Sequence, residues 1–168
     1  MFACRKPVVA AVQGPAIGGG LGVALVADFR VTCAEAKFSA NFNRLGFHPG
    51  FGLSATLPRL VGVQKAAMLF YTGRRINGTE AVDMGLADLL VPQDQVRTEA
   101  QKLAREIAVS APLAVQGTRD TLRQGLVESI RLAVARESEQ QNAQFKTEDF
   151  KEGVAAMAAR REPDFKGE

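Results

Sequence analysis

The stretch Val8-Val9-Ala10-Ala11-Val12-Gln13-Gly14-Pro15-Ala16-Ile17-Gly18-Gly19-Gly20-Leu21-Gly22 carries the strongest structural signal in this chain. Its apolar first part predicts a buried strand, and its glycines predict a tight turn that opens a helix. Consecutive glycines leave the turn without Cβ atoms, so backbone N–H groups can approach a ligand closely. The first N–H groups of a helix lack a partner within the helix, and the helix dipole favours negative charge there. The turn is a candidate site for a phosphate or a developing oxyanion, although tight packing of a helix on a sheet would also explain the glycines.

The composition is that of an ordinary globular protein. The chain has 168 residues, of which 46% are hydrophobic and 23% charged, so we expect one folded domain without disordered tracts. The 21 basic and 18 acidic residues are interspersed, and the net charge of +3 gives no basic stripe for nucleic acid. No apolar run has the length that spans a bilayer and no leader is evident, which predicts a cytoplasmic protein without a membrane partner.

The two cysteines, Cys4 and Cys33, lie in apolar surroundings and show no CxxC spacing. His48 is the only histidine that could join them, so we expect no metal site. Both cysteines are predicted to be buried free thiols in a reducing compartment.

Short strands are expected in the first half of the chain and helices in the second. The expected elements are strands at 29–32, 37–40 and 89–91, an irregular loop at 41–52, and helices at 21–27, at 80–84 capped by Thr79, from about 94, at 113–124, at 126–145 and after the cap Thr147. So few strands leave a sheet edge open, which proteins normally cover, and we expect part of the fold to be missing on the N-terminal side.

Two of these helices carry patterns that predict their environment. Apolar residues in the helix that begins near residue 94 recur at helical spacing and predict one buried stripe, namely Val96, Ala100, Leu103, Ala104, Ile107 and Ala108. The helix at 126–145 becomes polar over 137–144, so its end is expected to project into water or to meet another subunit.

Several ordered segments resemble the crotonase family, the enoyl-CoA hydratases and isomerases. They are Lys6–Gly14 with Ala16–Gly20, Ala27–Val31, Ala36–Phe38, Leu45–Gly52, Leu57–Gly62, Tyr71–Ile76, Glu80–Ala87 and Arg161–Phe165. The resemblance implies an α/β fold with a spiral ββα core, here truncated at its N-terminus, and the chain looks like the C-terminal two thirds of a subunit. Residues 1–92 would form the partial core with the oxyanion turn and a pocket loop, and residues 93–168 a helical trimerisation region.

The resemblance also implies a chemistry and the residues that carry it. Family members bind an acyl-CoA thioester and stabilise an enolate-like oxyanion with two backbone N–H groups, one of which would belong to Gly19, with Gly18 and Gly20 as further substrate contacts. The two glutamates that transfer protons in hydratases fall here on Gly22 and Phe42. Neither residue can carry a proton, which puts ordinary hydration in doubt.

Other residues are then candidates for the remaining roles. The remaining polar candidates are Asn41, Asn43, Arg44 and His48, of which the two asparagines and the histidine are proposed for catalysis. Phe42 becomes a substrate contact. Arg160 matches a basic position that reaches the phosphates of coenzyme A on a neighbouring subunit. The resemblance implies a homotrimer or hexamer, and coenzyme A enters as part of the substrate, with no separate cofactor.

Two functions remain open at this stage. The first is an acyl-CoA enzyme of hydratase or isomerase type, of the lyase or isomerase class, that uses groups other than glutamate for proton transfer. The alternative is a non-catalytic acyl-CoA-binding or structural paralogue, or an inactive fragment. A dinucleotide site is disfavoured because Val23 stands where the last glycine of GxGxxG would fall, and a serine peptidase is excluded because no serine lies between Met1 and Thr32.

Overall fold

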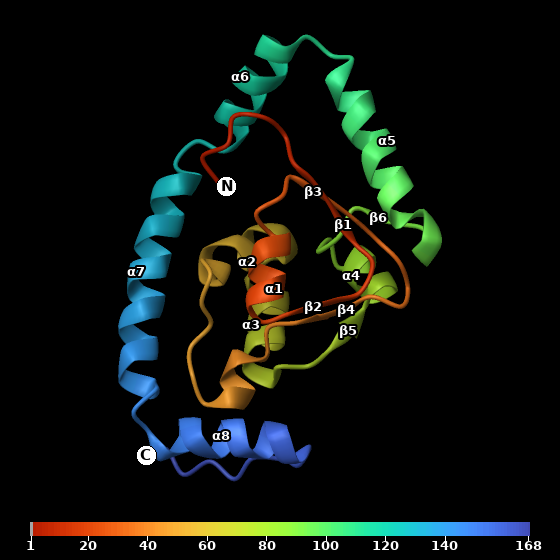
Figure 1. The fold of residues 1–168 in the computed structure, drawn as a ribbon. Coiled ribbons are helices and arrows are strands. Elements are labelled where there is room, and N and C mark those ends of the chain that lie inside the picture. Colours follow the sequence, from red (N-terminus) through yellow and green to blue (C-terminus); the bar gives the residue numbers. More distant parts are fainter. Residues whose placement is uncertain (1) are drawn as a thin grey trace.

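The computed structural model describes residues 2–168, in which short strands form two small sheets surrounded by helices (Figure 1). The first sheet is parallel, with the order β1 (Val9–Val12), β3 (Phe29–Thr32) and β6 (Leu89–Leu90). The second has the order β2 (Pro15–Ile17), β4 (Lys37–Ser39) and β5 (Ile76–Asn77), and β5 is antiparallel to β4. β1 and β2 therefore lie at open sheet edges within the described chain.

The helices divide into a central group and an outer group (Figure 1). The central ones are α1 (Gly19–Ala24), α2 (Leu53–Val61), α3 (Val63–Thr72) and α4 (Gly78–Asp83), with the 3-10 turn η1 (Asn41–Leu45). The outer ones are α5 (Val96–Ala108), preceded by the 3-10 turn η2 (Gln93–Gln95), and α6 (Pro112–Leu122), α7 (Leu126–Gln144) and α8 (Glu148–Ala159). One apolar core joins the sheets to the central helices, and its fully buried members include Leu21, Val31, Phe38, Leu53, Leu57 and Leu86.

The stretch at 8–22 folds with one more strand than the sequence predicted. Between β1 and the glycines the chain forms β2, in which Ala16 pairs with Phe38 of β4. The helix that follows begins at Gly19 and ends at Ala24, three residues before the predicted end. It ends because the chain tightens there, with the N–H of Val26 donating to the carbonyl of Val23 in a 3-10 bond.

The N-cap of α4 corrects a second prediction. Asn77 caps this helix in place of Thr79, because its side chain accepts from the N–H of Glu80 (2.9 Å) while Glu80 accepts from the N–H of Asn77 (2.7 Å). This reciprocal capping box satisfies two donors, whereas a lone threonine cap would satisfy one. The cap predicted at Thr147 is confirmed, since its hydroxyl accepts from the N–H of Phe150 at 3.1 Å.

The stripe predicted on α5 is buried only in its first half. Val96 and Ala100 are buried against β1 and β3, but Ala104 and Ala108 are exposed. Figure 1 shows the reason, since α5 starts beside β6 and then runs beyond the sheets. Of the two cysteines, Cys33 is buried as expected, whereas Cys4 is exposed because it lies in the N-terminal segment outside the core. No helix within residues 2–168 combines the length and the apolar character needed to cross a membrane.

Candidate functional site

The glycine turn joins the end of β2 to the first turn of α1. Gly18 has φ +55° and ψ −117°, a conformation that glycine adopts without strain, and its N–H donates to the carbonyl of Ser39 at 2.8 Å. The helix begins at Gly19, and no side chain caps it. The N–H of Gly19 is therefore one of the first-turn donors that have no partner within the helix.

Three side chains surround this turn. A Cβ built on Gly18 would lie 3.5 Å from Oδ1 of Asn41 and 3.7 Å from Cζ of Phe42. A Cβ on Gly19 would lie only 2.7 Å from the ring of Phe51. The structure thus brings Asn41 and Phe42, two predicted site residues, to Gly18, and it adds Phe51, which sequence reasoning missed.

Phe51 also accounts for the glycine at position 22. A Cβ on Gly22 would lie 2.4 Å from Cβ of Phe51 and 3.1 Å from its Cγ. Contacts below 3.0 Å require one group to move, and Cβ of Phe51 can move only with its backbone. In this fold any side chain at position 22 competes with Phe51 for the same space. The third glycine, Gly20, has no such neighbour, since nothing lies within 4 Å of its Cβ position.

Phe42 is held in an aromatic cluster on the other side of the turn. Its side chain is buried and packs edge to face on Phe47, with ring centroids 5.5 Å apart. The Phe47 ring in turn packs on Phe145, which follows α7, and on Phe150 of α8. The distances between ring centroids are 5.0 Å and 5.7 Å. Two aromatic rings, those of Phe42 and Phe51, therefore stand beside the glycine turn, and neither can transfer a proton.

His48 is held mainly by α7. Its Nδ1 lies 2.7 Å from the carbonyl of Pro49, its backbone N–H donates to Oε1 of Gln144 at 2.7 Å, and its carbonyl accepts from Gln141 at 2.8 Å. Within residues 2–168 none of these contacts joins His48 to the glycine turn. Asn43 lies on η1 next to Phe42, and no hydrogen bond of its side chain forms among the described residues.

Glu137 of α7 is a buried carboxylate that the sequence analysis overlooked. It accepts from the backbone N–H groups of Gly52 (2.7 Å) and Ser54 (2.9 Å) and from the Ser54 hydroxyl (2.6 Å). It thereby caps the N-terminus of α2, where negative charge is favourable. The expectation that the polar end of this helix meets water or another subunit holds for only one of its faces. Residues 138, 139, 142 and 143 are exposed, whereas Glu137, Gln141 and Gln144 bind the loop at 48–54. Their i, i+4, i+7 spacing on one helix face was the signal that could have shown this.

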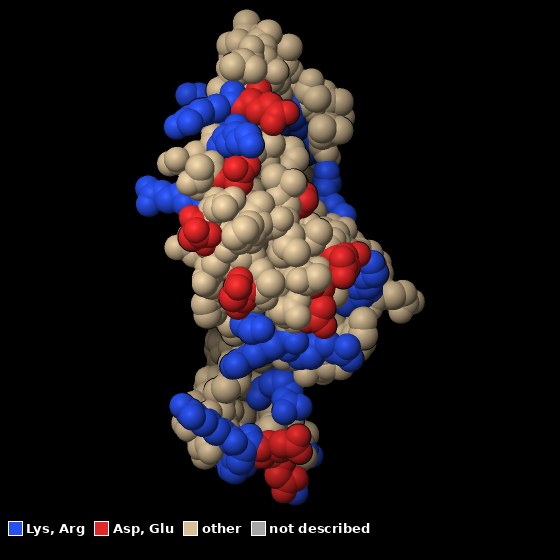
Figure 2. All heavy atoms as spheres, turned by 90° about the vertical axis from the view of Figure 1, so that its right-hand side faces the viewer, with Lys and Arg blue, Asp and Glu red and all other residues tan. Residues whose placement is uncertain are grey.

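Arg160 lies at the end of α8, in the left-handed conformation with φ +55°. It lines a hollow of about 570 Å³ together with Arg44, Arg75 and Arg161. Figure 2, which shows the right-hand side of Figure 1, has Lys and Arg side chains gathered over its lower part, next to a smaller group of Asp and Glu. Arg161 donates to Oε2 of Glu152 at 2.7 Å, and this hydrogen bond raises the pKa of Arg161 and lowers the pKa of Glu152 to about 2. Arg44 and Arg75 come from distant segments, which is why the sequence did not group them with Arg160.

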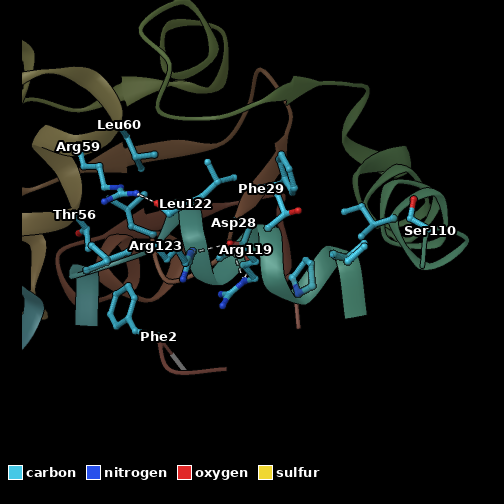
Figure 3. A pocket seen from close by; sticks show the side chains of 18 of the residues that line it. Phe2, Asp28, Phe29, Thr56, Arg59, Leu60, Ser110, Arg119, Leu122 and Arg123 are labelled. Atoms are coloured by element: carbon cyan, nitrogen blue, oxygen red, sulfur yellow. Dashed lines mark hydrogen bonds and ion pairs between the residues drawn. The ribbon is translucent and has the colours of Figure 1, made fainter. Parts of the chain in front are cut away.

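A separate pocket of about 570 Å³ lies between the end of α1, α2 and α6 (Figure 3). Asp28 stands in its wall, accepts from the N–H of Val8 (2.8 Å) and from Nε of Arg119 (3.0 Å), and forms an ion pair with Nε of Arg123 (2.9 Å). Burial is the main cause that lowers the pKa of Arg123, and Asp28 opposes this effect. None of the predicted site residues lines this pocket, and Asp28 links the N-terminal segment to α6 through these contacts.

Within residues 2–168 no group of three or more His, Cys, Asp or Glu side chains is arranged to hold a metal ion. The arrangement offers instead an unpaired backbone donor, two aromatic walls and a separate cluster of guanidinium groups. A backbone N–H in this setting can bind a carbonyl oxygen on which negative charge develops.

The chain is similar to known proteins along its whole length. Residues 1–168 match the family described as "Enoyl-CoA hydratase/isomerase". A crotonyl-CoA hydratase of Syntrophomonas wolfei is 38% identical over 163 residues, which are 97% of this chain and 63% of that protein. A short-chain-enoyl-CoA hydratase of Clostridium acetobutylicum is 36% identical over 157 residues, which are 94% of this chain and 60% of that protein.

A solved structure agrees with this match. The enoyl-CoA hydratase/isomerase of Pseudoalteromonas atlantica superposes with a TM-score of 0.91 at 33% identity, and the match covers 98% of this chain and 66% of that one. This confirms the predicted fold class. The chain spans less than two thirds of the length of both curated relatives described above.

Proposed function

Because this chain belongs to the enoyl-CoA hydratase/isomerase family, we propose that it carries the larger part of a site that processes acyl-CoA thioesters. Coenzyme A is then part of the substrate and not a separate cofactor. The relatives' names refer to enoyl-CoA and crotonyl-CoA hydratases, and the proposal transfers the acyl-CoA class from them but not the hydration step.

The position of Gly19 carries this proposal. Its N–H opens α1 without a capping side chain, next to the turn that Gly18 makes at φ +55°. In the proposed role Gly19 donates to the thioester oxygen as negative charge develops there, with Gly18 and Gly20 as contacts beside it. In enzymes, the loss of one such donor costs about 10²–10³ in rate.

The absence of both glutamates sets the limits of the reaction. The positions that carry them in hydratases hold Gly22 and Phe42, and Phe51 fills the space above Gly22. Asn41, whose Oδ1 lies beside Gly18, is the polar candidate nearest to the turn, and Asn43 and His48 stay candidates with weaker geometric support. We therefore propose a thioester reaction in which no carboxylate at position 22 or 42 transfers the proton.

The basic hollow supports a place for the phosphates of coenzyme A. Arg160, Arg44 and Arg75 line it together, and guanidinium groups bind phosphate by paired N–H donors. In the family arrangement such a contact would serve the site of a neighbouring subunit.

A homotrimer or hexamer is part of the proposal. Large apolar side chains are exposed on α6, α7 and α8, among them Leu113, Leu122, Leu132 and Val154. Exposed apolar side chains on several neighbouring helices are typical of surfaces that bind another subunit. The proposed division into a core at 1–92 and a helical region at 93–168 stays a prediction, with α5 packed on β1 and β3.

Isothermal calorimetry with octanoyl-CoA and with free coenzyme A tests this function. The 168-residue chain and any longer polypeptide encoded by its gene should be measured, together with turnover of crotonyl-CoA. Binding with turnover of any acyl-CoA supports an enzyme, and tight binding without turnover supports the non-catalytic paralogue. Failure of both polypeptides to bind either compound would refute the acyl-CoA proposal.

A further inference from the structure

Phe51 has an unusual backbone for an aromatic residue. Its φ is +61°, in the left-handed region that favours glycine, and the residue is 59% exposed. A residue with a side chain costs roughly 1–2 kcal/mol in this backbone conformation. Because the Phe51 side chain is largely exposed, its packing does not offset this cost. Such strain persists where surrounding contacts impose it, and it is frequent at ligand-binding positions.

The contacts on both sides of Phe51 fix this conformation. Gly52 donates its N–H to the buried carboxylate of Glu137, and Gly50 packs so closely on Gln141 that a Cβ there would lie 2.6 Å from its Nε2. The loop is therefore anchored to α7 immediately before and after Phe51. The direction of the phenyl ring follows from this anchoring.

The anchored ring lies along one face of α1. Its Cβ and Cγ lie over Gly22, and its Cε and Cζ atoms lie over Gly19. Residues three apart share a helix face, so the ring covers a continuous strip of backbone between these two glycines. One face of the ring rests on this strip, and the exposure of the residue leaves its other side open.

We propose that the open face of the Phe51 ring binds the acyl group of the substrate, and that it selects medium-chain alkyl or aryl thioesters over short ones. This inference rests on the proposed function. Because the Cε and Cζ atoms of the ring lie over Gly19, an acyl group whose oxygen binds the Gly19 N–H would lie beside this end of the ring. A two-carbon acyl group ends before it can cover the ring, whereas a longer chain buries the open face and excludes water from the turn.

Affinities for octanoyl-CoA, acetyl-CoA and free coenzyme A test the inference by calorimetry. Phe51→Ala should lower the affinity for octanoyl-CoA by about 5- to 50-fold, the effect of burying part of a phenyl ring. The affinities for acetyl-CoA and free coenzyme A should change by less than about two-fold, because neither covers the ring. Tyr71→Ala is the matched control, since Tyr71 is an aromatic residue exposed on α3, and it should leave all three affinities unchanged.

Phe51→Gly provides a second variant whose backbone suits the left-handed conformation, so that a folding defect of the alanine variant leaves the test intact. If the variants lose affinity equally for all three compounds, or lose none for octanoyl-CoA, the role of Phe51 is overturned while acyl-CoA binding by the wild type still stands. If neither the 168-residue chain nor a longer polypeptide encoded by its gene binds any of the compounds, the proposed function is overturned, and this inference with it.

Discussion

Replacing Gly22 by alanine tests whether the Phe51 ring rests on the glycine face of α1. The new Cβ would lie 2.4 Å from Cβ of Phe51, so the anchored loop must shift. Overpacking of this kind costs about 1–3 kcal/mol, whereas alanine is favoured over glycine within a helix by about 0.5–1 kcal/mol. The chain with Gly22→Ala should therefore be destabilised by about 0.5–2 kcal/mol.

The same change should have the opposite sign once Phe51 is replaced by glycine. The obstacle is then gone, and Gly22→Ala should stabilise the chain by about 0.5–1 kcal/mol through helix propensity. The two substitutions should thus be coupled by about 1–3 kcal/mol. Gly20→Ala is the matched control, because its Cβ position on the same helix is open and its effect should be equal in both backgrounds.

Urea unfolding followed by the helical circular dichroism signal measures all these free energies, with equal m-values as the condition for comparison. If Gly22→Ala stabilises the wild-type chain and the Phe51→Gly variant equally, the ring does not occupy the strip above α1. A glutamate at position 22 should be tolerated only together with a small residue at position 51, because both side chains would occupy the same space. A gain of hydration activity therefore requires this combination as well as Phe42→Glu.

Three further predictions concern charged groups. Asp28→Asn should destabilise the chain by about 3–5 kcal/mol in urea unfolding, because it leaves one buried and one partly buried guanidinium group without their carboxylate. Glu137→Gln should cost about 1–3 kcal/mol and speed hydrogen exchange at Gly52, whereas the exposed control Glu139→Gln should cost less than about 0.5 kcal/mol. The hydrogen bond from Arg161 lowers the pKa of Glu152 from 4.5 to about 2, so the stability it contributes is present above pH 4.5 and lost as the pH falls toward 2. Melting temperatures measured between these pH values should fall less steeply for Glu152→Gln than for wild type.

Local patterns predicted the elements that depend on neighbours along the chain. The strand at 29–32 and the helix cap at Thr147 were predicted correctly because strand propensity and capping act over a few residues. The cap of α4 was assigned to the wrong residue, although the spacing of Asn77 and Glu80 was visible in the sequence. β2 was missed because three residues ending at a glycine turn carry too little periodicity to be distinguished from the turn.

Some features of the candidate site could be predicted from the sequence, and others required the structure. The sequence indicated the glycine turn, and it predicted that Gly22 and Phe42 stand in place of two proton-transferring glutamates, because both depend on residue types at fixed spacing from recognisable motifs. Phe51 was missed because an aromatic residue between two glycines has no sequence signature for the surface it covers. The grouping of Arg44 and Arg75 with Arg160 could not be predicted either. These residues lie far apart in the sequence, and only the fold brings η1, the segment before β5 and the end of α8 together.

Residue types and their spacing were enough to establish the family, the order of most of its elements and the absence of glutamates at Gly22 and Phe42. The chain carries these properties in any conformation. The folded arrangement was needed to place Phe51 on α1 and to bring Glu137 to the amide of Gly52, a contact between residues 85 positions apart. Such contacts depend on how helices and loops pack, and packing is decided by shape and burial over the whole molecule.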